Sequence, residues 1–254
     1  MPHDRRTFLG LLAAGAAAGV LGPISRATAA PRSGIRAIAF DAFPVFDPRP
    51  VFALAERLFP GRGAELGNAW RTRQFEYQWL RALSGQYADF REATEDALVY
   101  ATKLLKLDLT ADKRGSLMQA YLELKAWPDA PGALAALKRS GFKLAFLSNM
   151  TAAMLESGIR TAGLEGLFDH VLSTDRIRTY KPDPRAYRLA TETFGLDKRE
   201  ILFVAFAGWD AAGAKAFGYP TFWVNRLGLP REELGFAPDA TGTTLADLVR
   251  VAAA

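Results

Sequence analysis

The sequence contains no cysteine and only two histidines, His3 and His170. The absence of cysteine excludes disulfide bonds, thiolate zinc sites, iron–sulfur clusters and a cysteine nucleophile. A metal centre built from several histidines is also excluded, and a Ser-His-Asp triad would have to use His170. If the chain is an enzyme, we expect its chemistry to rest on carboxylates, lysine, arginine and amides.

No large excess of charge of one sign is present. The 254 residues include 32 basic and 27 acidic side chains, which gives a formal net charge of +5. This charge is too small to indicate nucleic-acid binding, and we expect no nucleic-acid partner. Half of the residues are hydrophobic and 23% are charged. That composition is typical of a globular protein with one large domain, or with a core and a smaller insert.

The N-terminal segment has the pattern of a targeting signal. Arg5 and Arg6 precede an apolar stretch over residues 9–21, and the Ala-Thr-Ala at residues 27–29 fits a cleavage site. We expect residues 1–29 to be a twin-arginine signal peptide, recognised by the twin-arginine export machinery. The protein would then be periplasmic, with no membrane contact after cleavage. The alternative is a short N-terminal membrane anchor, although the stretch is shorter than the ~20 residues that span a bilayer.

The rest of the chain alternates between short apolar runs and helix-like segments. The runs predict strands at residues 35–40, 142–147, 170–172, 201–207 and 220–225. Helical spacing falls at residues 131–140, 151–162, 184–194 and 209–217. A glycine follows each of these helices, as is common at helix C-termini. This alternation predicts an α/β fold, a parallel sheet with helices on both faces.

One long segment interrupts the alternation. Residues 50–125 have helical spacing and no convincing strand. We therefore expect a helical cap over residues 50–127, inserted after the first strand, and an α/β core formed by residues 34–49 and 128–254. The segment is rich in aromatic residues: Phe52, Phe59, Trp70, Phe75, Tyr77, Trp79, Tyr87, Phe90 and Tyr100.

Five polar residues stand where such a fold binds its ligands. Asp41, Ser148, Asn149 and Asp210 each follow an apolar run directly or within a few residues, and Lys181 lies in a loop just before a helix. In open parallel sheets, ligands bind beyond the carboxyl ends of the strands. Asp41 alone could be a turn residue and Lys181 alone a surface lysine. Together, the five positions predict a site at one rim of the sheet.

Several stretches across the chain resemble a known family. They are Ala39-Phe40-Asp41, Phe59-Pro60-Gly61-Arg62-Gly63, Trp70-Arg71, Gln74-Phe75-Glu76-Tyr77-Gln78-Trp79-Leu80-Arg81, Ala93-Thr94-Glu95-Asp96-Ala97-Leu98, Leu147-Ser148-Asn149, Tyr180-Lys181-Pro182-Asp183 with Tyr187, and Trp209-Asp210-Ala211 with Gly213-Ala214. The pattern is similar to the haloacid dehalogenase (HAD) superfamily, and in detail to its type II L-2-haloacid dehalogenases. The resemblance implies a HAD-like Rossmannoid core with a helical cap, and it suggests a homodimer.

The resemblance also implies a reaction. Asp41 would displace halide from C2 of a small halogenated carboxylic acid and form an aspartyl ester, which water then hydrolyses. Inversion at C2 would convert an (S)-2-haloacid into an (R)-2-hydroxyacid. Arg71 from the cap would hold the leaving halide, with Asn149 as a second donor and Phe90 as an apolar wall.

The remaining site residues take their roles from the same resemblance. Lys181 would pair with Asp41 and keep it ionised. Ser148 would help to hold the substrate carboxylate, and Asp210 would orient Lys181 or act on the hydrolytic water. Tyr187 and Trp209 would shape the pocket, or would serve as plain core aromatics.

The sequence argues against a magnesium phosphatase, which is the other main chemistry of the superfamily. Those enzymes carry Asp-x-Asp, whereas the residue two after Asp41 is Phe43. They also place an acidic cluster after the fourth strand, where this chain offers Asp210 alone. Hard cations need several oxygen ligands. We therefore expect no metal and no cofactor.

The chain departs from the dehalogenase pattern at two places. The family reads Asp-x-Tyr-Gly-Thr-Leu-Phe-Asp after the first strand, whereas this chain is one residue shorter and has Pro44 or Val45 near the place of the threonine. The family's Ser-Ser-Asn before the final Trp-Asp is replaced by Ala205, Phe206 and Ala207. Removal of a preorganised donor can lower a rate by ~10²–10³. The groups for ester formation are therefore better retained than those that position water and the nucleophile.

We expect a metal-independent hydrolytic dehalogenase. One alternative is a HAD-type hydrolase with a different substrate. Another, from a different class, is a non-catalytic periplasmic protein that binds small carboxylates.

Overall fold

The computed structural model describes residues 34–252, so the predicted signal peptide over residues 1–29 lies outside the described residues. A six-stranded sheet forms the centre of the molecule, in the order β5-β4-β1-β6-β7-β8, with every neighbouring pair parallel. The strands are β1 (Ala37–Phe40), β4 (Lys143–Ser148), β5 (His170–Ser173), β6 (Ile201–Ala205), β7 (Thr221–Val224) and β8 (Ala240–Gly242). The predicted α/β class is confirmed.

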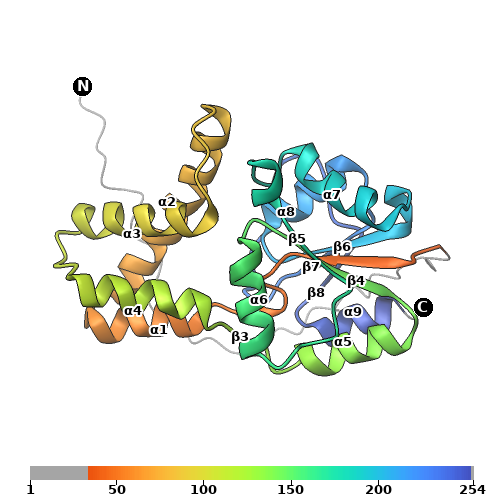
Figure 1. Cartoon of the computed structure of the whole chain (residues 1–254), viewed down its shortest axis with the longest axis horizontal. Helices are drawn as coiled ribbons and strands as arrows, with labels where there is room; N and C mark the ends of the chain where they lie inside the picture. The colour runs from red at the N-terminus through yellow and green to blue at the C-terminus, as the bar shows by residue number, and fades with distance from the viewer. Residues whose placement is uncertain (1–33, 253–254) are drawn as a thin grey trace, which may run out of the picture.

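Helices cover both faces of the sheet. They are α5 (Ala130–Arg139), α6 (Ala152–Thr161), α7 (Pro184–Phe194), α8 (Gly208–Phe217) and α9 (Leu245–Ala252). In Figure 1, α7 and α8 lie above the sheet, and α5 and α9 lie below it. The strands alternate accordingly: Ala37 and Ala39 of β1 pack toward α7 and α8, whereas Ile38 and Phe40 belong to the core on the other face.

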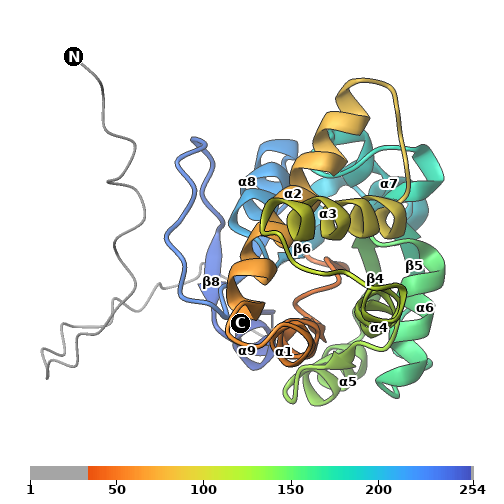
Figure 2. The same cartoon turned by 90° about the vertical axis from the view of Figure 1, so that its left-hand side faces the viewer.

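Four helices between the first and second core segments form a separate layer. They are α1 (Arg49–Leu58), α2 (Gly63–Leu83), α3 (Phe90–Leu104) and α4 (Ala111–Leu122). Side-chain caps define two of their starts, because Asp89 accepts from Glu92 N and Thr110 accepts from Lys113 N. In Figure 2 this layer faces the viewer, in front of the sheet. Within residues 34–252, none of the helices is both long and apolar enough to span a bilayer.

A two-stranded antiparallel sheet joins the cap layer to the core. β2 (Phe46–Asp47) precedes α1 and pairs with β3 (Lys125–Ala126), which follows α4. The chain therefore leaves the core and returns to it at neighbouring points. Sequence analysis missed this pair, as well as β8 and α9. β2 and β3 have two residues each and β8 has three, so they are too short for an apolar period to mark them.

Candidate active site

Asp41 lies directly after β1, the strand between β4 and β6. Its backbone N–H donates to Val204 O on β6 at 2.9 Å, which extends the ladder by one residue. One carboxylate oxygen, Oδ2, accepts from the backbone N–H of Phe43 at 3.3 Å. The residue is 8% exposed. The strand end and the following turn thus orient the carboxylate at the rim of the sheet.

Lys181 connects the two carboxylates predicted from the sequence. Its Nζ lies 2.9 Å from Asp41 Oδ1 and 2.6 Å from Asp210 Oδ2, and the side chain is 1% exposed. Burial favours the neutral amine, but the two carboxylates outweigh burial and raise the pKa of Lys181. The ammonium therefore stays charged and places a positive charge between two acids far apart in the sequence.

Asp210 lies in the first turn of α8 and is 1% exposed. Burial is the largest influence on it and raises its pKa to about 6, partly opposed by the charge of Lys181. The Tyr187 hydroxyl on α7 donates to Asp210 Oδ1 at 2.8 Å. Asp210 is thus a carboxylate held by two donors, and near neutral pH it can accept a proton.

Ser148 and Asn149 follow at the end of β4, next to Asp41. The Ser148 hydroxyl accepts from the backbone N–H of Met150 at 3.2 Å. Asn149 Oδ1 accepts from the backbone N–H of Lys181 at 2.9 Å. Asn149 Nδ2 donates to Gln78 Oε1 on α2 at 3.0 Å. Asn149 therefore connects the loop of Lys181 to the cap, and this contact uses one of the two N–H groups of its amide.

The three remaining predicted residues, Trp209, Phe90 and Arg71, lie on α8, α3 and α2. Trp209 is half-buried and makes edge-on contacts with Phe75 and Trp79 of α2, at centroid distances of 5.4 and 5.5 Å. Phe90 begins α3 and is buried within the main hydrophobic core. Arg71 is exposed on α2. Among the described residues, no hydrogen bond or ion pair joins Arg71 to Asp41.

A second contact joins the cap to the site. Trp79 Nε1 on α2 donates to the backbone carbonyl of Lys181 at 3.2 Å. With the bond between Gln78 and Asn149, two consecutive residues of one cap helix thus bind two different core loops. The carboxyl edge of the sheet is therefore covered by α2.

Hydrogen bonds from two residues distant in the sequence fix the shortened loop after Asp41. Trp127 donates from Nε1 to Phe43 O and from its backbone N–H to Val45 O, both at 2.9 Å. Arg226 Nη2 donates to Pro44 O at 2.9 Å. Three consecutive carbonyls are thus fixed. Sequence analysis missed these anchors, because nothing in the local pattern links residues 127 and 226 to residue 43.

Arg226 is itself held in place by charge and stacking. Its guanidinium pairs with both oxygens of Asp129, at 2.9 and 3.0 Å, and lies 4.4 Å from the centre of the Trp127 ring. A bidentate, stacked arginine has little freedom to move. The loop that follows Asp41 therefore has a rigid support that does not depend on a threonine side chain.

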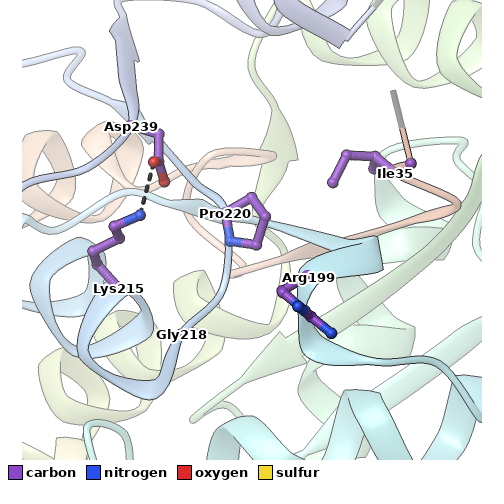
Figure 3. A pocket seen from close by; sticks show the side chains of 7 residues that line it. Ile35, Arg199, Lys215, Gly218, Pro220 and Asp239 are labelled. Carbon is purple, nitrogen blue, oxygen red and sulfur yellow. Dashed lines mark hydrogen bonds and ion pairs between the residues drawn. The ribbon is translucent and has the colours of Figure 1, made fainter. Parts of the chain in front are cut away.

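A cavity of about 290 Å³ lies at the opposite end of the sheet. Figure 3 shows Ile35, Arg199 and Pro220 around it, and each of these residues precedes a strand. The Lys215 ammonium on its wall pairs with Asp239 at 2.7 Å. Asp41, Lys181 and Asp210 do not line this cavity.

Comparison with known proteins agrees with this architecture. Residues 29–218 match the family of haloacid dehalogenase-like hydrolases. The chain is 45% identical over 218 residues to an (S)-2-haloacid dehalogenase of Pseudomonas sp. (strain YL), covering 85% of this chain and 94% of the relative. It is 43% identical over 220 residues to a haloacetate dehalogenase of Moraxella sp. (strain B), covering 86% and 98% respectively.

A solved structure of an L-2-haloacid dehalogenase is also similar to this chain. The L-2-haloacid dehalogenase of Xanthobacter autotrophicus with chloropropionic acid covalently bound has a TM-score of 0.79 and 38% identity, covering 85% of this chain and 98% of that chain. A parallel sheet with a helical cap and a buried acid–lysine–acid row defines a HAD-like hydrolase. More narrowly, this chain belongs to the L-2-haloacid dehalogenase family.

Proposed function

We propose that this protein hydrolyses (S)-2-haloacids to (R)-2-hydroxyacids through an ester on Asp41. The observation that carries the proposal is the buried pair of Asp41 and Lys181 at the end of β1. The names of the relatives from Pseudomonas and Xanthobacter, and the covalently bound chloropropionic acid of the latter, support the substrate class.

The first step is a displacement. An oxygen of the Asp41 carboxylate attacks C2 of the substrate from the side opposite the halogen. The C–O bond forms as the C–halogen bond breaks, the halide leaves with the bonding pair, and C2 inverts. Lys181 pairs with Asp41 at 2.9 Å and orients its carboxylate until the ester forms. We assign Arg71 to the leaving halide and Phe90 to the apolar wall beside it.

The second step is hydrolysis of the ester. Water attacks the Asp41 carbonyl carbon, Asp210 accepts its proton, and the ester oxygen leaves as the hydroxyl of the product once it is reprotonated. Asp41 is regenerated as a carboxylate. In total, haloacid and water give hydroxyacid, halide and a proton. The raised pKa of Asp210 suits it to accept the proton from water. A base with a pKa near the working pH can also return that proton to the ester oxygen.

The other residues hold the substrate or the acids. We assign Ser148 to the substrate carboxylate, and we assign Tyr187 and Trp209 to the pocket wall and to the orientation of Asp210. The ammonium of Lys181 bridges the two carboxylates at 2.9 and 2.6 Å and offsets one of their two negative charges. A positive charge supplied by the protein next to Asp41 supports a reaction that needs no metal or cofactor.

Chloride release from (S)-2-chloropropionate tests this function. Wild-type protein should release chloride in excess EDTA, and Asp41→Asn should not, because an amide is a poor nucleophile of the same shape. A single turnover in H₂¹⁸O should then label the peptide that contains Asp41. Substrate binding without chloride release would favour a binding protein. Loss of activity with EDTA and its recovery with magnesium would favour a phosphatase-like hydrolase.

We further propose an exported homodimer in which residues 50–127 form the cap and residues 34–49 with 128–254 form the core. The pattern of Arg5, Arg6 and the apolar stretch supports export. The positions of β2 and β3, which bracket α1–α4, support the division into cap and core. Sedimentation of the purified protein tests the dimer.

A further inference from the structure

Gln78 is a fully buried polar residue of the cap that faces the core. It lies on α2, and its side-chain Oε1 accepts from Asn149 Nδ2 at 3.0 Å. Its Nε2 is buried as well, but it has no acceptor among the described residues. A buried donor without an acceptor is unfavourable, so Gln78 Nε2 should be stabilised by a bound hydrogen-bond acceptor.

The surrounding bonds determine which atom of Gln78 is unpaired. The backbone N–H of Lys181 can only donate, and it donates to the side chain of Asn149 at 2.9 Å. That atom of Asn149 must therefore be its oxygen, which leaves Asn149 Nδ2 to face Gln78. Gln78 must then present its oxygen to Asn149. The unpaired atom is therefore Nε2, a donor, and a ligand that binds it has to be an acceptor or an anion.

The proposed displacement places the leaving group on the side of the cap. Asp41 approaches C2 from the sheet, so the halogen has to depart in the opposite direction. The carboxyl edge of the sheet is covered by α2, which contacts the site through Gln78 and Trp79. Arg71 lies seven residues before Gln78, and this spacing puts both residues on one face of the helix.

We propose that Gln78 Nε2 is a halide donor of the site, with Asn149 as the residue that positions it. This inference rests on the proposed function. One N–H of Asn149 Nδ2 is bonded to Gln78 Oε1 at 3.0 Å, and this bond fixes the orientation of the Gln78 amide so that Nε2 is the donor that the cap offers. Gln78 would bind the halide as its bond to C2 breaks, together with Arg71. Its role is selectivity for the leaving group rather than for the substrate carboxylate.

Bromide binding to Gln78→Glu tests this assignment without substrate. The substitution keeps the acceptor for Asn149 and replaces only the NH₂ group with a carboxylate oxygen. Binding is followed by the saturable change in tryptophan fluorescence at constant ionic strength. We expect the affinity for bromide to fall at least about tenfold, the effect of losing one hydrogen bond to an ion. The matched control is Gln74→Glu, one turn earlier on α2, where Nε2 already donates to Thr94, and it should change the affinity little.

A measurement on the wild-type protein covers the case in which a buried glutamate prevents folding. Bromide should shift the side-chain amide signal of Gln78 in a ¹H–¹⁵N spectrum, assigned by its absence in Gln78→Met, whereas propionate should leave it unmoved. The inference is overturned if bromide does not move this signal, if propionate moves it, or if both glutamate variants lose affinity equally. Failure of the proposed function would give a different result. Bromide would still shift the Gln78 signal, but the wild-type protein would release no chloride from 2-chloropropionate.

Discussion

Trp127 Nε1 donates to the carbonyl oxygen of Phe43 at 2.9 Å, two residues after the proposed nucleophile. The bond joins the residue that follows β3 to the loop that orients Asp41. Because the loop lacks the threonine of related enzymes, its geometry depends on groups such as this one.

Trp127→Phe should slow the first chemical step. The substitution retains an aromatic ring but removes the N–H that donates to Phe43 O. The carbonyl of Phe43 then loses this hydrogen bond, and we expect the free energy of unfolding to fall by about 1–3 kcal/mol. The measurement is the rate of the halide burst, together with urea unfolding. Trp70→Phe is the control, because Trp70 Nε1 donates to Thr94 O within the cap. If both variants change the burst rate equally, Trp127 has no specific role in positioning the loop.

The steady rate should fall as the pH drops through about 6. Burial raises the pKa of Asp210 to about 6, and the protonated acid cannot accept a proton from water. Asp210→Asn should lower the rate and remove this acid limb. An unchanged acid limb in that variant would assign the limb to another group.

The same group predicts a dependence of stability on pH. The pKa of Asp210 is higher in the folded protein than its ordinary value of 3.8. The folded state therefore binds the proton more tightly, and the free energy of unfolding falls as the pH rises from about 4 to about 6. Urea unfolding of the wild type and of Asp210→Asn between about pH 4 and 6 measures this change in the free energy of unfolding. The part of the decrease that comes from Asp210 should be missing in the variant.

The aspartyl ester should accumulate during turnover, because the side chains of Ala205 and Ala207 have no polar atom that could hold a water molecule. Excess substrate should then release a burst of about one halide per site, followed by a slower steady rate. Ala207 is the N-cap of α8 and makes no side-chain cap bond. Ala207→Asn should therefore raise the steady rate more than the burst rate, and stabilise the fold by about 1 kcal/mol. A linear time course with no ester trapped by acid would show that hydrolysis is not the slow step.

Gly213→Ala should impair the site through Tyr187. A Cβ at residue 213 would lie 2.6 Å from Tyr187 Oη and 2.8 Å from Pro182 Cβ. Relief of this contact displaces the phenol from Asp210, so we expect lower activity and a loss of about 1–3 kcal/mol in stability. Gly115→Ala in α4 is the control, since a Cβ there meets nothing within 4 Å, and it should raise stability by about 0.5–1 kcal/mol. Equal thermal stability of the two variants would contradict the prediction.

Replacing both Arg5 and Arg6 with lysine should retain the protein in the cytoplasm, because the arginine pair is the proposed export signal. Fractionation followed by N-terminal sequencing measures location and cleavage. Wild-type localisation of the double variant in the periplasm would indicate a different export route.

Local pattern in the sequence was sufficient for much of the core. Five strands of the sheet and the helices α5–α8 lie within one or two residues of the positions predicted from apolar runs and terminal glycines. Asp41 and Asp210 could be selected because ligands of a parallel sheet gather at the carboxyl ends of its strands. Lys181 could be selected only together with the other polar residues, because a lysine in a loop is by itself uninformative.

Only the tertiary structure decided how the site is supported and covered. Gln78, Trp127 and Arg226 act on residues that lie 71, 84 and 182 positions away in the sequence. A hydrogen bond depends on the direction of its donor and acceptor, and that direction is set by the packing of whole helices rather than by the neighbouring residues. The sequence alone therefore determines which groups can react, whereas the fold determines which of them meet and which buried donor is left for a ligand.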